Sequence, residues 1–185
     1  MSPIRNDHGA GCLHQTANSR SEEVAPAAHV IFFEKGKRME TKEKIDELAK
    51  AAVFAELDGI DYMWSFTTAE MQRAYNGIGP EFLPEGIRAK VTDFLGLFAP
   101  AALIHDLRFE RSDGLRFMFN FANAEFRDNC IKLADAEYPW WRPRRYAARA
   151  CARIMYDFVS GSSGWRAWCE AKDARDGEND KGVKA

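Results

Sequence analysis

The pair of side chains best suited to chemistry in this sequence is His105 followed directly by Asp106, in the segment Ala-Ala-Leu-Ile-His-Asp-Leu-Arg-Phe. Imidazole gains and loses a proton near neutral pH, and a neighbouring carboxylate can orient it or bind a cation. The other three histidines of the chain all lie before residue 30. A lone His-Asp pair also occurs at the edge of ordinary helical cores, so these two residues alone leave a structural role open.

A loop upstream carries two glycines at alternate positions, in the sequence Tyr-Asn-Gly-Ile-Gly-Pro over residues 75–80. Glycines with this spacing allow backbone carbonyls to turn inward around a hard cation that takes oxygen ligands. The same residues are typical of a helix end followed by a proline-terminated turn. The loop therefore leaves both a cation site and a plain turn open.

Together the two segments resemble the phospholipase A2 superfamily, whose calcium loop reads Tyr-Cys-Gly-x-Gly and whose active-site helix reads Cys-Cys-x-x-His-Asp-x-Cys-Tyr. This chain keeps the tyrosine, both glycines, the histidine and the aspartate, and lacks the cysteines. Pro100-Ala101-Ala102 is similar to the Pro-Ala-Cys of bacterial members. Asn123 and Phe126 stand where the second active-site helix of those members has its Asp-x-x-Phe pattern. The resemblance covers about residues 75–130.

The resemblance implies a mainly α, phospholipase A2-like fold, with two antiparallel active-site helices preceded by a glycine-containing, calcium-loop-like turn. It also implies that His105 acts as the general base for a water molecule that attacks an ester carbonyl of a phospholipid. Asn123 falls at the position of the aspartate that orients the histidine in the family, and its side-chain oxygen can accept the imidazole N–H.

The resemblance further implies Ca²⁺ as the cofactor. Asp106 would supply carboxylate oxygens to the metal, and the backbone carbonyls of Tyr75, Gly77 and Gly79 would complete the protein ligands. The cation would then polarise the ester carbonyl and hold a lipid phosphate. A phospholipid or membrane surface is the partner that this chemistry implies.

Besides the missing cysteines, two further substitutions separate the chain from the family pattern. Asn123 is neutral where the family has a carboxylate, and Phe109 replaces a tyrosine. A neutral residue stabilises an imidazolium less than a carboxylate does. The alternative function is therefore a non-catalytic helical interaction module, or a phage-associated structural module, that retains the fold.

The hydrophobic pattern predicts a mainly α protein. Residues 1–38 are predicted to be a disordered lead, 39–170 a single helical domain and 171–185 a disordered charged tail, with Met1 or Met39 as the start of translation. Apolar residues recur at three- and four-residue spacing in most of the body. Helices are expected over residues 41–57, 67–75, 87–98, 100–109, 115–136 and 146–159.

Composition excludes several classes of function. A formal net charge of −2 and a pI of about 6.1 argue against binding to nucleic acid by phosphate neutralisation. The sequence has neither the apolar run of a membrane span nor the apolar region of a signal peptide, which predicts a cytoplasmic location. Four scattered cysteines without a CxxC pair are expected to be reduced thiols.

A second notable segment is Pro-Trp-Trp-Arg-Pro-Arg-Arg-Tyr, over residues 139–146. Tryptophans interleaved with arginines are typical of a membrane interface, with indoles at headgroup level and guanidinium groups on lipid phosphates. The alternative is structural, with Trp140 and Trp141 filling the core at a helix junction and the arginines forming a solvated face. The sequence leaves both interpretations open.

Overall fold

The computed structural model describes residues 40–76 and 85–182, and over these ranges the chain is helical without any strand. The expectation of a mainly α protein is therefore confirmed. The predicted lead of residues 1–38 and the predicted loop around residues 77–84 lie outside the described residues. The helices are α1 (Lys42–Phe54), α2 (Ile60–Met63), α3 (Thr68–Ala74), α4 (Glu85–Glu110), α5 (Arg116–Glu137), α6 (Pro143–Val159) and α7 (Ser162–Gly182).

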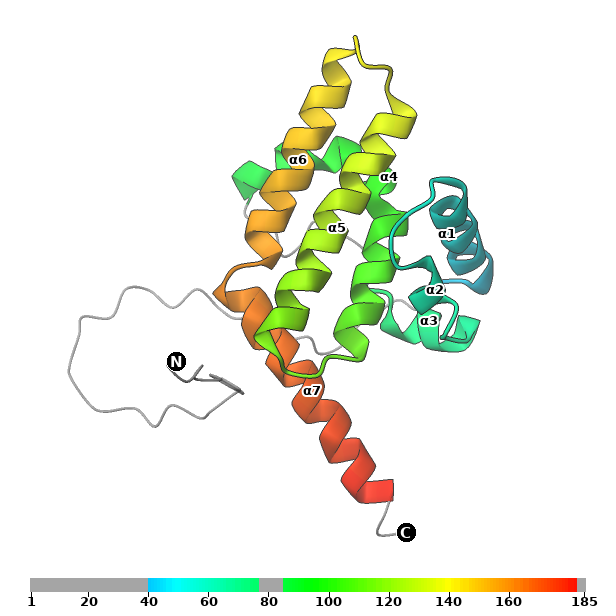
Figure 1. Cartoon of the computed structure of the whole chain (residues 1–185), viewed down its shortest axis with the longest axis vertical. Coiled ribbons are helices and arrows are strands. Elements are labelled where there is room, and N and C mark those ends of the chain that lie inside the picture. Colours follow the sequence, from blue (N-terminus) through cyan, green and yellow to red (C-terminus); the bar gives the residue numbers. More distant parts are fainter. Residues whose placement is uncertain (1–39, 77–84, 183–185) are drawn as a thin grey trace, which may run out of the picture.

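Three long helices form the body of the molecule. In Figure 1, α5 lies between α4 and α6, and short turns join it to both. Helices α1, α2 and α3 pack on the outer side of α4, while α7 crosses the ends of the long helices and then projects away from them. The α5–α6 turn and the end of α7 mark opposite ends of the long axis (Figure 1).

Local capping signals begin α1 and α3. The Thr41 hydroxyl oxygen accepts a hydrogen bond from the Lys44 amide at 3.2 Å. Thr67 and Glu70 form a complete capping box, in which the side chain of each residue accepts from the backbone N–H of the other. Such caps satisfy amide groups that have no partner inside the helix. Both predicted helix starts are confirmed.

Helix α4 differs from the expectation of two helices separated at Pro100. The structure has one continuous helix over these residues, with Pro100 inside it. An interior proline costs about 3 kcal/mol because it removes a backbone hydrogen bond. The residues on either side of it compensate by burial, since Phe94, Phe98 and Ala101 are almost inaccessible to solvent. In Figure 1 the first part of α4 passes behind α5 and α6 before the helix runs beside α5.

Helices α5 and α6 form an antiparallel pair that is joined by ion pairs. The carboxylate of Asp135 on α5 accepts hydrogen bonds of 2.7 Å from Arg145 and from Arg149 on α6. Burial raises the pKa of Asp135, but these two hydrogen bonds outweigh it and hold the pKa below its ordinary value. Pro143 occupies the first turn of α6, where its missing N–H has no intrahelical partner to lose.

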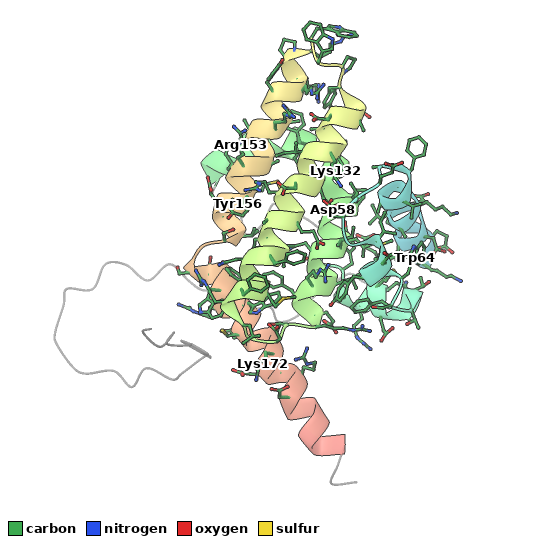
Figure 2. All side chains as sticks on the ribbon, in the orientation of Figure 1. Asp58, Trp64, Lys132, Arg153, Tyr156 and Lys172 are labelled. Atoms are coloured by element: carbon green, nitrogen blue, oxygen red, sulfur yellow. The ribbon has the colours of Figure 1, made fainter. Side chains whose placement is uncertain are left out.

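The connection after α1 is fixed by α5. The side chain of Asn129 accepts from the Asp58 amide at 2.7 Å and donates to the Asp58 carbonyl at 2.9 Å. Lys132 adds a 2.7 Å ion pair to the Asp58 carboxylate, and these two labelled side chains meet in Figure 2. Gly59 precedes α2 with a φ of 87°. Its position matters because a Cβ there would lie 2.8 Å from Ile104.

Helix α7 occupies residues for which the composition predicts a disordered tail, since it extends through residue 171 to Gly182. The apolar residues at its start explain the difference. Trp168 is 2% exposed, and its carbonyl accepts a 2.7 Å hydrogen bond from the Ser112 hydroxyl. Further along, Lys172 and Asp176 form an ion pair one turn apart, at 2.6 Å.

Among the described residues, no helix combines the length and the apolar character needed to cross a bilayer. Cys130 and Cys151 are buried and lie outside any disulfide, as expected. Cys169 is disulfide-bonded, so the expectation of reduced thiols is wrong at this position.

Candidate functional site

The antiparallel helices α4 and α5 bring His105 and Asn123 together. The Nε2 atom of His105 lies 2.9 Å from the Oδ1 atom of Asn123, and both side chains are buried. When Nε2 carries the hydrogen, the amide oxygen accepts it, which leaves the lone pair of Nδ1 available. The arrangement thus holds the ring in the tautomer that a general base requires.

Aromatic rings fix the plane of the imidazole. The rings of Phe109 and Phe126 lie on α4 and α5, with centroids 4.7 Å and 4.8 Å from that of His105. A ring confined in this way has little rotational freedom, so its Nδ1 atom points in a defined direction. Phe109 packs edge-on against Trp168 of α7, at 4.9 Å between centroids.

Asp106 faces the loop that the sequence connects with a cation. Its Oδ2 atom accepts a 2.8 Å hydrogen bond from the backbone amide of Asn76. Its Oδ1 atom lies 4.0 Å from the Nδ1 atom of His105. The carboxylate therefore sits between the imidazole and the end of α3, which is where the resemblance would require a metal ligand.

Tyr75 borders the same carboxylate. Burial, and then the negative charge of Asp106, raise the pKa of the Tyr75 phenol to about 12. Burial disfavours the charged phenolate, and the negative charge of Asp106 disfavours it further. Tyr75 thus belongs to the core and to the rim of the candidate site at once.

One polar atom of the site lacks a partner. The Nδ2 atom of Asn123 is buried and makes no hydrogen bond within the described part of the chain. A buried donor left without an acceptor costs about 1–3 kcal/mol. An aspartate at this position would place a carboxylate oxygen, in place of the N–H donor, at the same buried point.

The structure describes only part of the expected metal ligands. Asp106 and the backbone of Tyr75 belong to the described residues, whereas Gly77 and Gly79 lie outside them. No group of three or more His, Cys, Asp or Glu side chains that could hold a metal occurs among the described side chains, those of residues 40–76 and 94–177. The site that the resemblance implies, built of one carboxylate and backbone carbonyl oxygens, would contain only one such side chain, that of Asp106.

Two phenylalanines of α5 are buried near the candidate site. Phe119 has no exposed surface, and its ring packs 5.9 Å from that of Trp168. Phe126 is 3% exposed and belongs to the main core. For these two side chains the structure favours the core-filling role.

The sequence interpretation missed two features beside the site. The first is α7, whose Trp165 and Trp168 cover Phe119 and Phe109; their spacing of one helical turn was the available signal. The second is a buried ion pair between Arg108 and Glu125, with two hydrogen bonds of 2.9 Å and 3.0 Å. The sequence alone does not indicate which of its distant opposite charges form a pair.

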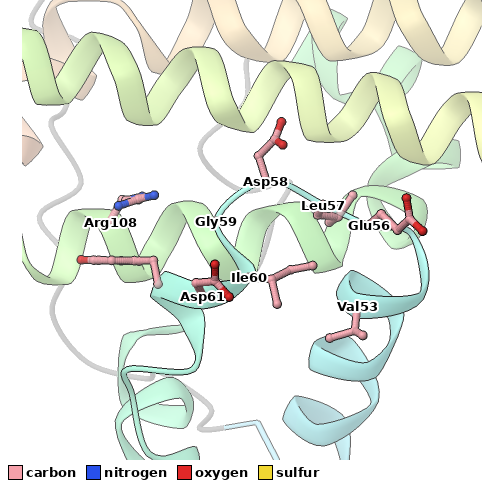
Figure 3. A pocket seen from close by; sticks show the side chains of 9 residues that line it. Val53, Glu56, Leu57, Asp58, Gly59, Ile60, Asp61 and Arg108 are labelled. Atoms are coloured by element: carbon pink, nitrogen blue, oxygen red, sulfur yellow. The ribbon is translucent and has the colours of Figure 1, made fainter.

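A surface depression of about 600 Å³ lies close to that ion pair. Neither His105 nor Asn123 lines it, and Figure 3 shows Arg108 at one side and the α1–α2 connection along the other. The depression is thus distinct from the His105 site. Its walls are formed by Val53, Glu56, Leu57, Asp58, Gly59, Ile60, Asp61, Tyr62 and Arg108.

Comparison with known proteins does not assign a family. No family model, curated protein or solved structure matches this chain.

Proposed function

We propose that this chain hydrolyses a carboxylic ester of a phospholipid in a Ca²⁺-dependent reaction, with His105 as the general base. The observation that supports this function most directly is the hydrogen bond between His105 Nε2 and Asn123 Oδ1. It fixes the tautomer in which Nδ1 can accept a proton. The side of the ring that bears Nδ1 is also the side on which Asp106 lies.

In the proposed reaction, Nδ1 of His105 takes a proton from a water molecule while the water oxygen attacks the ester carbonyl carbon. Asn123 keeps its hydrogen bond to Nε2–H throughout and so prevents the ring from turning. Collapse of the tetrahedral intermediate breaks the ester bond, and the imidazolium returns its proton to the departing alkoxide oxygen. The products are a fatty acid and a lysophospholipid.

Ca²⁺, when bound, would polarise the ester carbonyl and neutralise charge on the lipid phosphate. Asp106 and the carbonyl of Tyr75 are the described residues that would hold it. Asp106 is suited to this role because one of its oxygens is fixed by the Asn76 amide, which sets the carboxylate against the loop. Burial around the loop also keeps the neighbouring phenol of Tyr75 neutral.

The test is release of fatty acid from phospholipid in mixed micelles by the purified full chain. We expect hydrolysis in the presence of Ca²⁺ and its loss when EGTA removes the cation. Asp106→Asn should abolish both hydrolysis and the thermal stabilisation of the chain by Ca²⁺. Asp157→Asn, which neutralises an exposed carboxylate of α6, is the matched control and should leave both unchanged.

A specific observation supports the second candidate, a helical interaction module without hydrolysis. Asn123 lacks the negative charge that would stabilise an imidazolium, and its Nδ2 atom is unsatisfied. If the chain binds no Ca²⁺, and fatty-acid release stays at the level of a protein-free control with and without the cation, the enzyme proposal fails and this alternative replaces it.

A further inference from the structure

The turn between α5 and α6 exposes large aromatic side chains at one end of the molecule. Trp140 is 69% exposed and Trp141 is 63% exposed, and their rings touch edge to face at 5.9 Å. Tyr146, in the first turns of α6, is 57% exposed. The interpretation in which the two tryptophans fill the core is therefore wrong, because the helices meet below the turn without enclosing them.

Unpaired positive charge surrounds these aromatic rings. Arg142 and Arg144 are exposed, and within the part of the chain that the structure describes neither forms an ion pair. The half-buried carboxylate of Asp135, at the end of α5, is already paired with Arg145 and Arg149. Among the described residues of the turn, these two guanidinium groups without an ion pair thus outnumber the one exposed carboxylate, that of Glu137.

Contacts within the chain restrict the conformation of the turn. Pro139 begins it, the Arg142 amide donates to the Pro139 carbonyl at 3.0 Å, and Pro143 starts α6. The guanidinium carbon of Arg144 lies 5.5 Å from the ring centre of Phe94. Because the backbone is restricted and Arg144 rests on an aromatic ring, presenting these groups to a partner costs little conformational entropy.

We propose that this turn, residues 138–146, docks on the surface of an anionic phospholipid bilayer. Indole and phenol rings are the side chains that settle at headgroup depth, and arginines beside them pair with lipid phosphates. The combination fits a charged bilayer better than an apolar protein groove, which would leave both guanidinium groups unpaired. In Figure 1 the turn stands clear of every other helix, so a flat surface can reach it.

The docking turn is distinct from the His105 site. About 22 Å of helix axis separates Asn123 from Tyr138 along α5, at a rise of 1.5 Å per residue. Docking therefore does not depend on hydrolysis or on Ca²⁺. It would attach the protein to a membrane even if the proposed catalytic function is absent.

The test is flotation of the purified full chain with vesicles, in EDTA so that no Ca²⁺ contributes. Vesicles contain either phosphatidylcholine alone or phosphatidylcholine with about one third phosphatidylserine. We expect binding to the anionic vesicles that weakens as salt is raised, and a loss of about tenfold or more in the variant Trp140→Ala/Trp141→Ala. Arg142→Gln/Arg144→Gln should remove the preference for anionic vesicles.

Two control variants separate docking from other causes. Trp64→Ala removes a tryptophan that is 58% exposed beside α2, away from the turn (Figure 2), and should bind as the unchanged chain does. His105→Ala should also bind normally, which distinguishes docking from the catalytic proposal. Equal binding by the double tryptophan variant would overturn the proposal. So would a dimer of the free chain that this variant abolishes, because the turn would then be a contact between two copies.

Discussion

His105 and Asn123 stand 18 residues apart in sequence and share a buried hydrogen bond of 2.9 Å between α4 and α5. The amide oxygen fixes one nitrogen of the imidazole and leaves the other free to act as a base. An amide performs this orienting role without the charge of a carboxylate. The contact therefore orients the imidazole of His105 but supplies no negative charge to stabilise an imidazolium.

Replacement of Asn123 by aspartate tests whether the missing negative charge limits the rate of hydrolysis. In Asn123→Asp, a carboxylate oxygen can accept the Nε2–H bond and also stabilise the imidazolium, so we expect kcat for ester hydrolysis to rise about tenfold or more. Steady-state hydrolysis assays measure the change. Asn120→Asp, which adds the same charge at an exposed position of α5, should leave kcat unaltered. A folded Asn123→Asp variant with lower kcat would contradict the role assigned to this residue.

Removal of one partner from the buried ion pair between Arg108 and Glu125 should destabilise the fold. Their side chains are 14% and 5% exposed, and the guanidinium group also lies 3.9 Å from the ring centre of Tyr62. Arg108→Met leaves the Glu125 carboxylate buried without a partner, so we expect a loss of about 3–5 kcal/mol in unfolding free energy.

Urea denaturation measures that loss, and Arg108→Met/Glu125→Leu supplies its control. Because the double variant leaves no isolated charge, it should recover most of the stability. A single variant as stable as the unchanged chain would show that Glu125 finds water or another partner.

Replacement by alanine should change the stability of the fold in opposite directions at Gly59 and Gly96. Gly59 has a φ of 87°, and a Cβ there would lie 2.8 Å from Ile104 and 2.9 Å from Glu125. Gly59→Ala should therefore destabilise the fold by about 1–3 kcal/mol. Gly96 lies inside α4, and a Cβ added there would have no neighbouring atom within 4 Å. Gly96→Ala should therefore stabilise the fold by about 1 kcal/mol. Thermal unfolding compares them, and a stabilising Gly59→Ala would contradict the packing described around α2.

Alkaline pH should weaken the fold through Tyr75. The folded-state pKa of about 12 lies above the ordinary value of 10.0, so the unfolded chain releases this proton first. The stabilisation is complete below pH 10 and is lost as the pH rises towards 12. Unfolding free energy measured across this range should fall less steeply for Tyr75→Phe than for the unchanged chain. Identical slopes would place the Tyr75 hydroxyl in water.

Local signals in the sequence predict much of this fold. Thr41, Thr67 and Glu70 act on amides within three residues of themselves, so their caps could be read directly from the order of residues. The contact between His105 and Asn123 followed from the family resemblance, because nothing in their spacing alone requires two helices to meet there.

Other features depend on contacts between segments that are distant in sequence. Pro100 signals a helix start, but burial of Phe94 and Phe98 keeps α4 continuous across it. The charged tail reads as disordered, yet Trp168 anchors the beginning of α7 against Phe109 and Phe119. In both cases tertiary packing outweighs local preference.

The pH dependence of phospholipid hydrolysis by the unchanged chain and by His105→Gln tests the central claim most directly. Glutamine keeps a polar side chain in the pocket but cannot accept the water proton near neutral pH. We predict that kcat/KM of the unchanged chain rises with pH, because a general base must be unprotonated to act, and that His105→Gln retains less than about one hundredth of it. Lys50→Ala, a change at an exposed position of α1, serves as the control for handling and folding. Full activity of folded His105→Gln, with the same pH profile, would contradict the claim that His105 is the general base.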